Sequence, residues 1–232
     1  MIVFNGVSLD SVAGVRIEDI KVSPIRYNPV VRPRAIRFGS EFVRMGGGER
    51  TVTVSFALLD KDMINRHESL MNLSKWARTD AEYKLELPTD VNRYLVGVCT
   101  VKPDPSTRSW WENKLKLVFT CYTNPYWTAR QEKSVACGTA FTVLGDAPPF
   151  MRIERTLASS ASSQSYSDGT DTMTFSTIPA GSMVIDLNDQ TAKVGSTSIM
   201  QYYQPSGSFI IPAVGTHTIT GTGTVKYKER WE

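Results

Sequence analysis

The sequence is poor in the residues that metal sites and many catalytic sites require. Its 232 residues include only three cysteines, Cys99, Cys121 and Cys137, and only two histidines. The cysteines form no CxxC pair, so neither a zinc site made of four Cys and His ligands nor a dense disulfide framework is predicted. We therefore expect reduced thiols in structural positions, no metal and no cofactor.

Long hydrophobic runs and a strong net charge are also missing. No stretch of about 18 consecutive apolar residues occurs, so no membrane span is predicted. The N-terminus lacks a basic segment followed by an apolar run, so no signal peptide is predicted and we expect synthesis in a cytosol. The 26 basic residues exceed the 23 acidic residues by only three. This balance predicts no nucleic-acid-binding surface over the whole protein.

The rest of the composition is typical of a folded globular protein. Apolar residues make up 41% of the chain and charged residues 21%. Beyond Pro148-Pro149 charged residues become sparser and Ser and Thr more frequent. The cluster Gly145-Asp146-Ala147-Pro148-Pro149 is typical of a turn, because glycine allows turn geometry and proline biases the preceding residue away from helix. We therefore predict two domains, 1–147 and 148–232.

Alternating apolar and polar residues predict strands in the N-terminal domain, and one segment predicts a helix. The predicted strands include residues 15–22, 51–56, 83–87, 94–101 and 114–121. A helix is predicted over about 60–78, with Asp60 or Asp62 as its N-cap. Its apolar stripe comprises Met63, Leu70, Leu73 and Ala77, with Ile64 and Trp76 beside them. Strands around one long helix predict a compact α+β domain.

A basic segment within about 28–58 predicts an extended β-hairpin. Its basic and apolar residues alternate, and Gly46-Gly47-Gly48 is predicted to form a mobile tip. Aromatic and Arg side chains are typical of protein interfaces, so we favour an arm that reaches another subunit over a hairpin held against its own domain. The residues concerned are Arg32, Arg34, Ile36, Arg37, Phe38, Phe42, Arg44 and Arg50.

The C-terminal domain is predicted to be β throughout. Turn residues recur every 8–12 residues between short apolar strands, which is typical of a β-sandwich or jelly roll. The predicted strands include 151–155, 172–176, 182–187, 193–195, 209–212, 217–220 and 224–231. The Ser-rich tract 159–167 is predicted to be a loop or exposed strand that adds nothing to the core.

A search for reactive groups finds no strong candidate. His67 and His217 lie far apart in the sequence and no GxSxG motif accompanies them. Asp168-Gly169-Thr170-Asp171 and Asp186-Leu187-Asn188-Asp189 could be calcium loops or a glycosidase acid and base, but Asx turns explain both more simply. Gly46-Gly47-Gly48 leads into a strand and is not a phosphate-binding loop. We therefore predict that the protein is not an enzyme.

Aromatic residues offer one further possibility. Trp110, Trp111, Tyr126 and Trp127 could stack on sugars, but we favour packing in a core or an interface, because Trp and Tyr commonly anchor interfaces.

The order of these features resembles the distal tail proteins of long-tailed siphophages. The similarity is carried by the Arg-rich hairpin, the helix ending in Leu73-Ser74-Lys75-Trp76, the strand 83–87, the run Tyr94-Leu95-Val96-Gly97 and the segment 121–127. The C-terminal half is similar to that family's galectin-like β-sandwich, through residues 181–187 and 225–231. The resemblance covers almost the entire chain and rests on order and spacing rather than on one diagnostic motif.

The resemblance implies a mainly β protein with an N-terminal ring-forming α+β domain and a C-terminal galectin-like sandwich. It implies a homo-hexameric ring, or stacked rings, at the tail tip of a virion made in a bacterial cytoplasm. Partners would be the tail tube protein, the tail-associated fibre or lysin protein and receptor-binding components, with DNA in transit through the channel and no membrane. The implied belt that clasps the neighbouring subunit comprises Arg34, Arg37, Phe38, Phe42 and Arg44.

Two other functions stay open. One is a carbohydrate-binding module or glycan-processing protein, which would use Trp110, Trp111 and the C-terminal sandwich. The other is a tail-tube protein, which the second β domain argues against.

Overall fold

The protein folds into two compact units with separate cores. The structure is a computed structural model that describes residues 1–33, 40–60, 62–77, 80–101, 115–204 and 207–232, with the backbone alone in 28–33 and 40–47. Unit 1 comprises Met1–Trp127 together with Glu232, and unit 2 comprises Thr128–Trp231.

The division between the units comes earlier than the sequence predicts. Unit 1 ends its continuous span at Trp127, whereas the predicted boundary at Ala147 lies within unit 2. Pro148 and Pro149 belong to strand β12 (Ala147–Leu157), at a point where the pairing of β12 with β19 (Thr224–Trp231) shifts register. A β-bulge tolerates proline because it leaves some backbone N–H groups out of the ladder. The two prolines therefore mark a bulge and not a linker.

Unit 1 is built on one antiparallel sheet with the strand order β3–β5–β8–β7–β6–β1–β2. Residues Val52, Val54 and Phe56 of β5 alternate toward one face and are fully buried, as period-two alternation predicts. The strands are β1 (Val3–Phe4), β2 (Val7–Ser8), β3 (Val15–Val22), β5 (Ser40–Leu58), β6 (Tyr83–Leu87), β7 (Asp90–Val101) and β8 (Leu115–Cys121), with a short 3-10 turn η1 at Leu9–Ser11.

The single α-helix of the described residues, α1 (Met63–Trp76), covers the core of unit 1. Asp62 caps its first turn, with Oδ2 accepting a hydrogen bond from the Asn65 N–H at 3.4 Å. Leu70 and Leu73 are buried in the core, but Met63 is 45% exposed and Ile64 beside it 70% exposed. The predicted apolar stripe is therefore right in the second half of the helix and wrong at its start.

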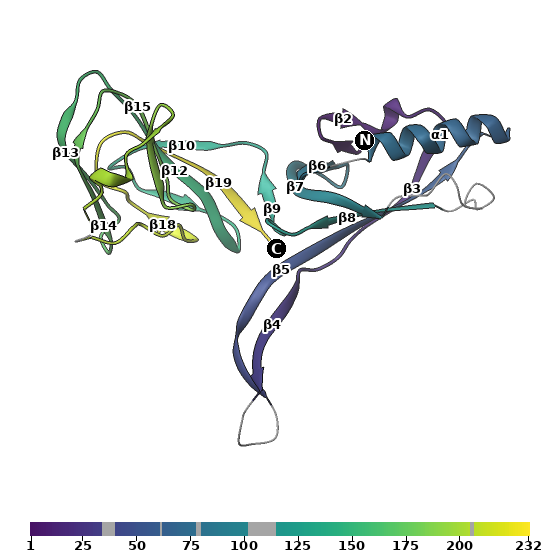
Figure 1. Cartoon of the computed structure of the whole chain (residues 1–232), viewed down its shortest axis with the longest axis horizontal. Helices are drawn as coiled ribbons and strands as arrows, with labels where there is room; N and C mark the ends of the chain where they lie inside the picture. The colour runs from purple at the N-terminus through teal and green to yellow at the C-terminus, as the bar shows by residue number, and fades with distance from the viewer. Residues whose placement is uncertain (34–39, 61, 78–79, 102–114, 205–206) are drawn as a thin grey trace. The chain divides into compact units, whose positions relative to one another are not determined.

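Strand β4 (Arg26–Pro33) and the first half of β5 form a two-stranded ribbon that leaves the body of unit 1 (Figure 1). We call β4 together with residues 40–49 of β5 the arm. The second half of β5 runs between β3 and β8 in the body, so one long strand belongs to both parts. Gly46–Gly48 lie inside β5, with Gly48 paired to Tyr27. The prediction that they form the tip is wrong.

Unit 2 consists of one large antiparallel sheet and two small ones that share a core. The large sheet has the order β10–β19–β12–β15–β16–β17, and the small ones pair β13 with β14 and β11 with β18. Together with β12 and β19, the strands are β10 (Lys133–Ala136), β11 (Phe141–Val143), β13 (Ala161–Ser167), β14 (Thr172–Ile178), β15 (Gly181–Asp186), β16 (Thr191–Val194), β17 (Thr197–Ser198) and β18 (Gly215–His217), with β9 (Trp127–Ala129) at the division between the units.

Two expectations for unit 2 are wrong. Residues 209–212 form no strand, although Phe209 and Ile210 are buried. The Ser-rich tract 159–167 contains β13, which agrees with the strand alternative, but its Tyr166 is 1% exposed within the core, so the prediction that the tract adds nothing to the core is wrong. The Tyr166 hydroxyl donates to the carbonyl oxygen of Thr222 at 3.1 Å, which satisfies its polar end.

Candidate functional site at the root of the hairpin arm

The predicted belt residues fall in and around the arm. Phe42 and Arg44 lie in β5, where their backbones pair with Val31 and Val30 of β4. Arg34, Arg37 and Phe38 lie outside the described residues. Their role in subunit contacts stays a prediction.

The arm begins where the sheet narrows from three strands to two. Along β5, Glu49 is the last residue that pairs with β4, through Arg26, and Arg50 is the first that pairs with β8, through Cys121. We call this crossover, residues 23–27 together with 48–51, the arm root. Strand β5 therefore runs without interruption from the arm into the core of the body.

Polar contacts join the arm root to two more distant parts of unit 1. The Tyr27 hydroxyl donates to Oε1 of Glu232 at 2.6 Å and lies 3.4 Å from the Tyr126 hydroxyl. The hydrogen bond to Glu232 is the main cause that raises the pKa of the Tyr27 phenol, because an ionised phenol would repel the carboxylate it now bonds.

Arg50 brings a buried charge to this cluster. It is 3% exposed and in phase with Val52 and Val54, so its side chain is on the core face of β5. Its Nε and Nη1 are buried without a hydrogen-bond partner among the described residues. Burial lowers the pKa of the guanidinium, and Cys121, Glu232, Tyr27 and Tyr126 are the groups whose charges oppose that effect. Glu232 is the only carboxylate among them.

The opposite side of the arm root has its own hydrogen bonds. Ser23 Oγ accepts from the backbone N–H of Thr51 at 2.9 Å and lies 3.1 Å from the Thr51 hydroxyl. The Ser23 N–H in turn donates to the Thr51 carbonyl oxygen at 2.9 Å. Hydrogen bonds therefore hold both sides of the crossover.

Gly48 gives the arm root its close packing. A Cβ atom at this position would lie 2.5 Å from Cγ2 of Ile25 and 3.0 Å from Cε1 of Tyr27. The side chains of Ile25 and Tyr27 therefore occupy the space over Gly48 that the Cβ atom of any other residue would fill. The glycine is needed for this approach and not for a turn.

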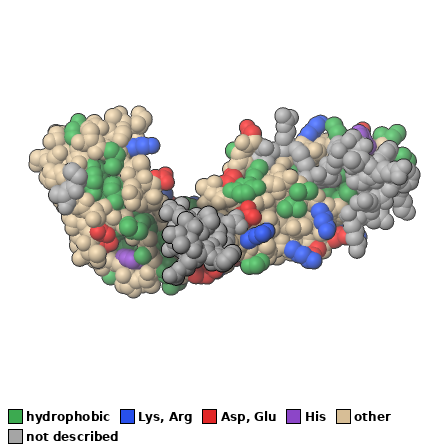
Figure 2. Space-filling view, turned by 60° about the horizontal axis from the view of Figure 1, so that its bottom comes forward, with side chains coloured by type: hydrophobic (Ala, Val, Ile, Leu, Met, Phe, Trp, Pro, Cys, Tyr) green, Lys and Arg blue, Asp and Glu red, His purple; other side chains and the backbone are tan. Residues whose placement is uncertain are grey.

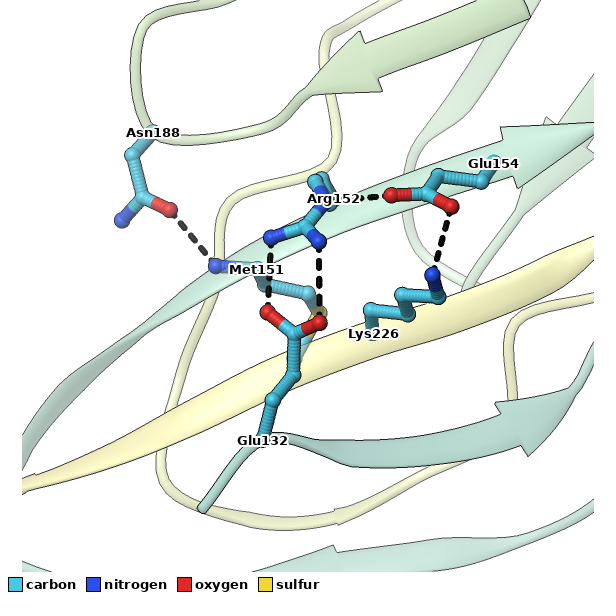
Figure 3. Close-up of polar contacts among 6 residues, drawn as sticks. All are labelled: Glu132, Met151, Arg152, Glu154, Asn188 and Lys226. Atoms are coloured by element: carbon cyan, nitrogen blue, oxygen red, sulfur yellow. Dashed lines mark hydrogen bonds and ion pairs between the residues drawn. The ribbon is translucent and has the colours of Figure 1, made fainter. Parts of the chain in front are cut away.

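The second polar cluster lies on the large sheet of unit 2 (Figure 3). Arg152 on β12 forms a bidentate pair with Glu132, at 2.7 and 2.9 Å, and its Nε donates to Glu154 at 2.6 Å. The other oxygen of Glu154 lies 2.7 Å from Nζ of Lys226. Every charge in this row has an opposite neighbour, so the cluster is suited to holding strands β12 and β19 together and offers no unpaired acid or base.

A groove of about 570 Å³ adjoins this cluster in unit 2. Hydroxyl and charged side chains line it, among them Glu154, Arg155 and Lys226. Its lining contains no aromatic side chain, so it offers no stacking platform for a sugar ring. Of the residues that the sequence singles out for sugar stacking, Trp110 and Trp111 lie outside the described residues. Tyr126 and Trp127 are not among the residues that line the groove.

The other candidate groups have structural explanations. Oδ1 of Asp168 accepts the N–H groups of Thr170 and Asp171, and Oδ1 of Asp186 accepts those of Asn188 and Asp189. Both segments are the predicted Asx turns. No group of three or more His, Cys, Asp or Glu residues within the described ranges could hold a metal ion.

The two histidines have separate surroundings. His67 is an exposed residue of α1 in unit 1. Nε2 of His217, in unit 2, lies 2.9 Å from the Ala213 carbonyl oxygen.

The drawn surface of the described residues carries no continuous basic area. In Figure 2 the Lys and Arg side chains stand mostly apart, with hydrophobic side chains in small separate groups. Of the helices in the described part of the chain, none has the length and apolar character needed to cross a membrane.

The cluster of Tyr27, Arg50 and Glu232 was missed by sequence reasoning. By composition, Arg50 belongs to the basic residues of the predicted arm. Its position in phase with Val52, Val54 and Phe56 was the signal that it faces inward. Nothing in the sequence pattern connects Tyr27 with Glu232, which are 205 positions apart.

Comparisons of the sequence with family models and with curated proteins find no match. Comparison of the structure finds the Dit protein (gp 19.1) of SPP1, described as a paradigm of the hub adsorption apparatus in phages that infect Gram-positive bacteria. The TM-score is 0.77 at 15% identity, and the match covers 100% of this chain and 98% of that chain. A weaker likeness, with a TM-score of 0.48 and 9% identity over 94% of this chain and 91% of that chain, is to the phage p2 baseplate in its activated conformation with strontium.

The likeness to the SPP1 protein shows a shared fold over both units. The mainly β fold implied by the resemblance to distal tail proteins is thereby confirmed. The galectin-like character of the second unit stays a prediction.

Proposed function

We propose that this protein is a structural subunit of the tail tip of a long-tailed phage. Six copies form a ring, and the arm of each copy clasps the next. The full-length likeness to the SPP1 Dit protein supports this proposal, since that protein is described as a hub of an adsorption apparatus.

The observation that carries the proposal is the arm. Beyond the root, in the described part of the chain, β4 pairs only with β5 and the first half of β5 only with β4. The eight residues of β4 would span about 26 Å as a strand. A two-stranded ribbon is marginally stable on its own in water, so a projecting one of this length is best explained by a surface that receives it.

Ring closure suits an arm of this kind. A head-to-tail contact between identical subunits closes into a ring when the rotation between neighbours fits, and each contact then repeats at every junction. Obligate contacts commonly bury about 2,000 Å² or more. An arm adds contact area without enlarging the body, and Phe38 and Phe42 would supply the apolar anchors.

The remaining parts of the proposal concern the ring's neighbours. The ring joins the tail tube to the tail-associated fibre or lysin protein, supports host-adsorption components and leaves a central channel for DNA. The protein is made in the bacterial cytoplasm and acts in the virion, through contacts and without catalysis.

The test is the mass of the protein in solution. Multi-angle light scattering over a concentration series should give a ring mass for the wild type and a monomer mass for the double variant Phe38→Ser and Phe42→Ser. Ile64→Ser is the matched control, because Ile64 is 70% exposed on α1, outside the arm. It should leave the ring intact. Far-UV circular dichroism checks that all three proteins are folded.

Two results would overturn the proposal. One is an unchanged ring mass in the double arm variant. The other is a wild type that stays monomeric both in isolation and when cross-linked within purified virus particles.

No observation favours either alternative. The groove in unit 2 lacks an aromatic platform for a saccharide. The second β unit, which has its own core, argues against the tail-tube alternative, because a tube ring can be formed by a single domain.

A further inference from the structure

We propose that Tyr27, Arg50 and Glu232 form a polar lock that fixes the direction in which the arm leaves the body. The inference rests on the proposed function, because an arm must point in a defined direction to reach a neighbouring copy. The lock itself, however, is a property of the single chain. It can therefore be tested apart from ring formation.

The first part of the argument is the placement of the three residues. Tyr27 is the second residue of β4, and Arg50 lies two positions beyond its pairing partner Gly48 on β5. The two side chains thus come from the two different strands of the arm root. Glu232 binds the first of them directly, through the 2.6 Å hydrogen bond from the Tyr27 hydroxyl.

The second part is the buried charge. Arg50 is 3% exposed, and its Nε and Nη1 find no hydrogen-bond acceptor among the described residues. A buried guanidinium in this condition depends on negative charge in its surroundings. Glu232 is the only carboxylate among the groups that act on Arg50. Tyr27 hydrogen-bonds that carboxylate and so keeps the negative charge near the Arg50 guanidinium.

The third part is the tight packing under Tyr27. Its ring lies over Gly48 on the neighbouring strand, with no room for a Cβ atom there. Packed in this place, the ring directs its hydroxyl toward Glu232 and Tyr126. Because the Ser23 and Thr51 hydrogen bonds hold the opposite side, loss of the lock should loosen the root on one side and let the arm swing.

The test uses hydrogen–deuterium exchange of the full chain. Tyr27→Phe removes the hydroxyl and keeps the ring, and we expect the amides of residues 48–51 to exchange about tenfold faster, as loss of one hydrogen bond to a charged group allows. Tyr202→Phe is the matched control, since Tyr202 belongs to unit 2 and not to the arm root. It should leave exchange at the root unchanged.

A second variant pair tests the charge. Glu232→Gln keeps an oxygen that can accept from Tyr27 but removes the negative charge, and it should also speed exchange at residues 48–51. Arg50→Met replaces the guanidinium with an apolar side chain, a change that buried charges often tolerate well. In the Arg50→Met background, Glu232→Gln should have no further effect. Glu68→Gln, on the exposed face of α1, is the control for loss of one carboxylate.

The outcomes separate the lock from the proposed function. Faster exchange at the root in Tyr27→Phe, together with ring formation that requires about tenfold more protein, supports the lock and its role in positioning. Unchanged exchange overturns the lock and leaves the proposed function standing. Faster exchange with ring formation as in the wild type overturns the positioning role. A wild type that never forms rings overturns the proposed function, and the exchange results still decide whether the lock exists.

Discussion

Lys133 and Glu229 form an ion pair across strands β10 and β19, with Nζ 2.7 Å from Oε1. The lysine side chain is 44% exposed, whereas the glutamate side chain is 5% exposed. The same Oε1 accepts the backbone N–H of Leu144 at 2.9 Å. The buried carboxylate therefore joins a surface lysine to the backbone that follows β11, and its energetic importance lies more in the part-buried hydrogen bond from the Leu144 N–H than in the exposed ammonium.

This difference leads to a prediction about two substitutions of Glu229. Glu229→Gln keeps an oxygen for the Leu144 N–H and should lower the free energy of unfolding of unit 2 by less than about 1 kcal/mol. Glu229→Ala leaves that N–H without an acceptor and should cost about 2 kcal/mol. Urea unfolding followed by hydrogen exchange in unit 2 measures both. Asp189→Ala, at an exposed turn, is the control, and equal costs for the Gln and Ala variants would contradict the interpretation.

The row of charges around Arg152 leads to a prediction about pH. Hydrogen bonds from Lys226 and then Arg152 hold the pKa of Glu154 below its ordinary value of 4.5. A carboxylate with a lowered pKa in the folded state contributes stability above the unfolded pKa and loses it as the pH falls through the folded one. The partners are partly exposed, so solvent screening limits the contribution to about 0.5–1 kcal/mol.

The variant Glu154→Gln should therefore be less stable than the wild type at pH 7 and should approach it below pH 4. Urea midpoints of unit 2 at pH 7, 5, 4 and 3 test this convergence. Asp189→Asn should follow the wild type throughout. A constant difference between Glu154→Gln and the wild type at all four pH values would show that the ionised carboxylate is not the source.

The sequence predicts many of the strands, because a strand with one buried face shows a local alternation of apolar and polar residues. The predicted strands 83–87 and 224–231 coincide with β6 and β19, since apolar residues recur at every second position over most of each strand. The unit boundary could not be predicted in this way. Pro148 and Pro149 are typical of a linker as a dipeptide, and only the long-range pairing of β12 with β19 accommodates them in a bulge.

The arm root shows a different limit. Local alternation suffices to place the Arg50 side chain on the core face, but the negative charge that favours its guanidinium is on Glu232, far along the chain. Gly48 likewise suggests a turn locally, whereas its role is to admit the Tyr27 ring. Side chains that act through distant partners carry no periodic signal, so the candidate site could be predicted only as a segment and not as a set of contacts.

Helix α1 offers a direct test of which apolar residues belong to the core. Leu70 is fully buried, and Leu70→Ala should lower the free energy of unfolding of unit 1 by about 2–5 kcal/mol because it leaves a cavity. Ile64 has the same hydrophobic character in the sequence but is exposed, and Ile64→Ser should change stability by less than about 0.5 kcal/mol. Urea unfolding read by exchange in β6 and β8 measures both. A large cost for Ile64→Ser would mean that another surface covers it.

Cys121 should be the least reactive of the three thiols. It is fully buried at the end of β8, and burial raises its pKa from 9.0 to about 12, with the nearby Glu82 acting in the same direction and Arg50 against it. At pH 8 this shift reduces the thiolate fraction about a thousandfold. Iodoacetamide labelling of the native protein, mapped by mass spectrometry, should modify Cys99 well before Cys121.

The same shift has a consequence at high pH that also tests the surroundings of Arg50. A thiol whose pKa is raised on folding contributes stability below its unfolded pKa and loses it as the pH rises from about 9 toward 12. Cys121→Ala removes this group, so the stability of unit 1 should decline less steeply above pH 9 in the variant. Because Arg50 opposes the shift, Arg50→Met should make native Cys121 still slower to label at pH 9, whereas faster labelling would mean that the guanidinium screens the thiol rather than stabilising its thiolate.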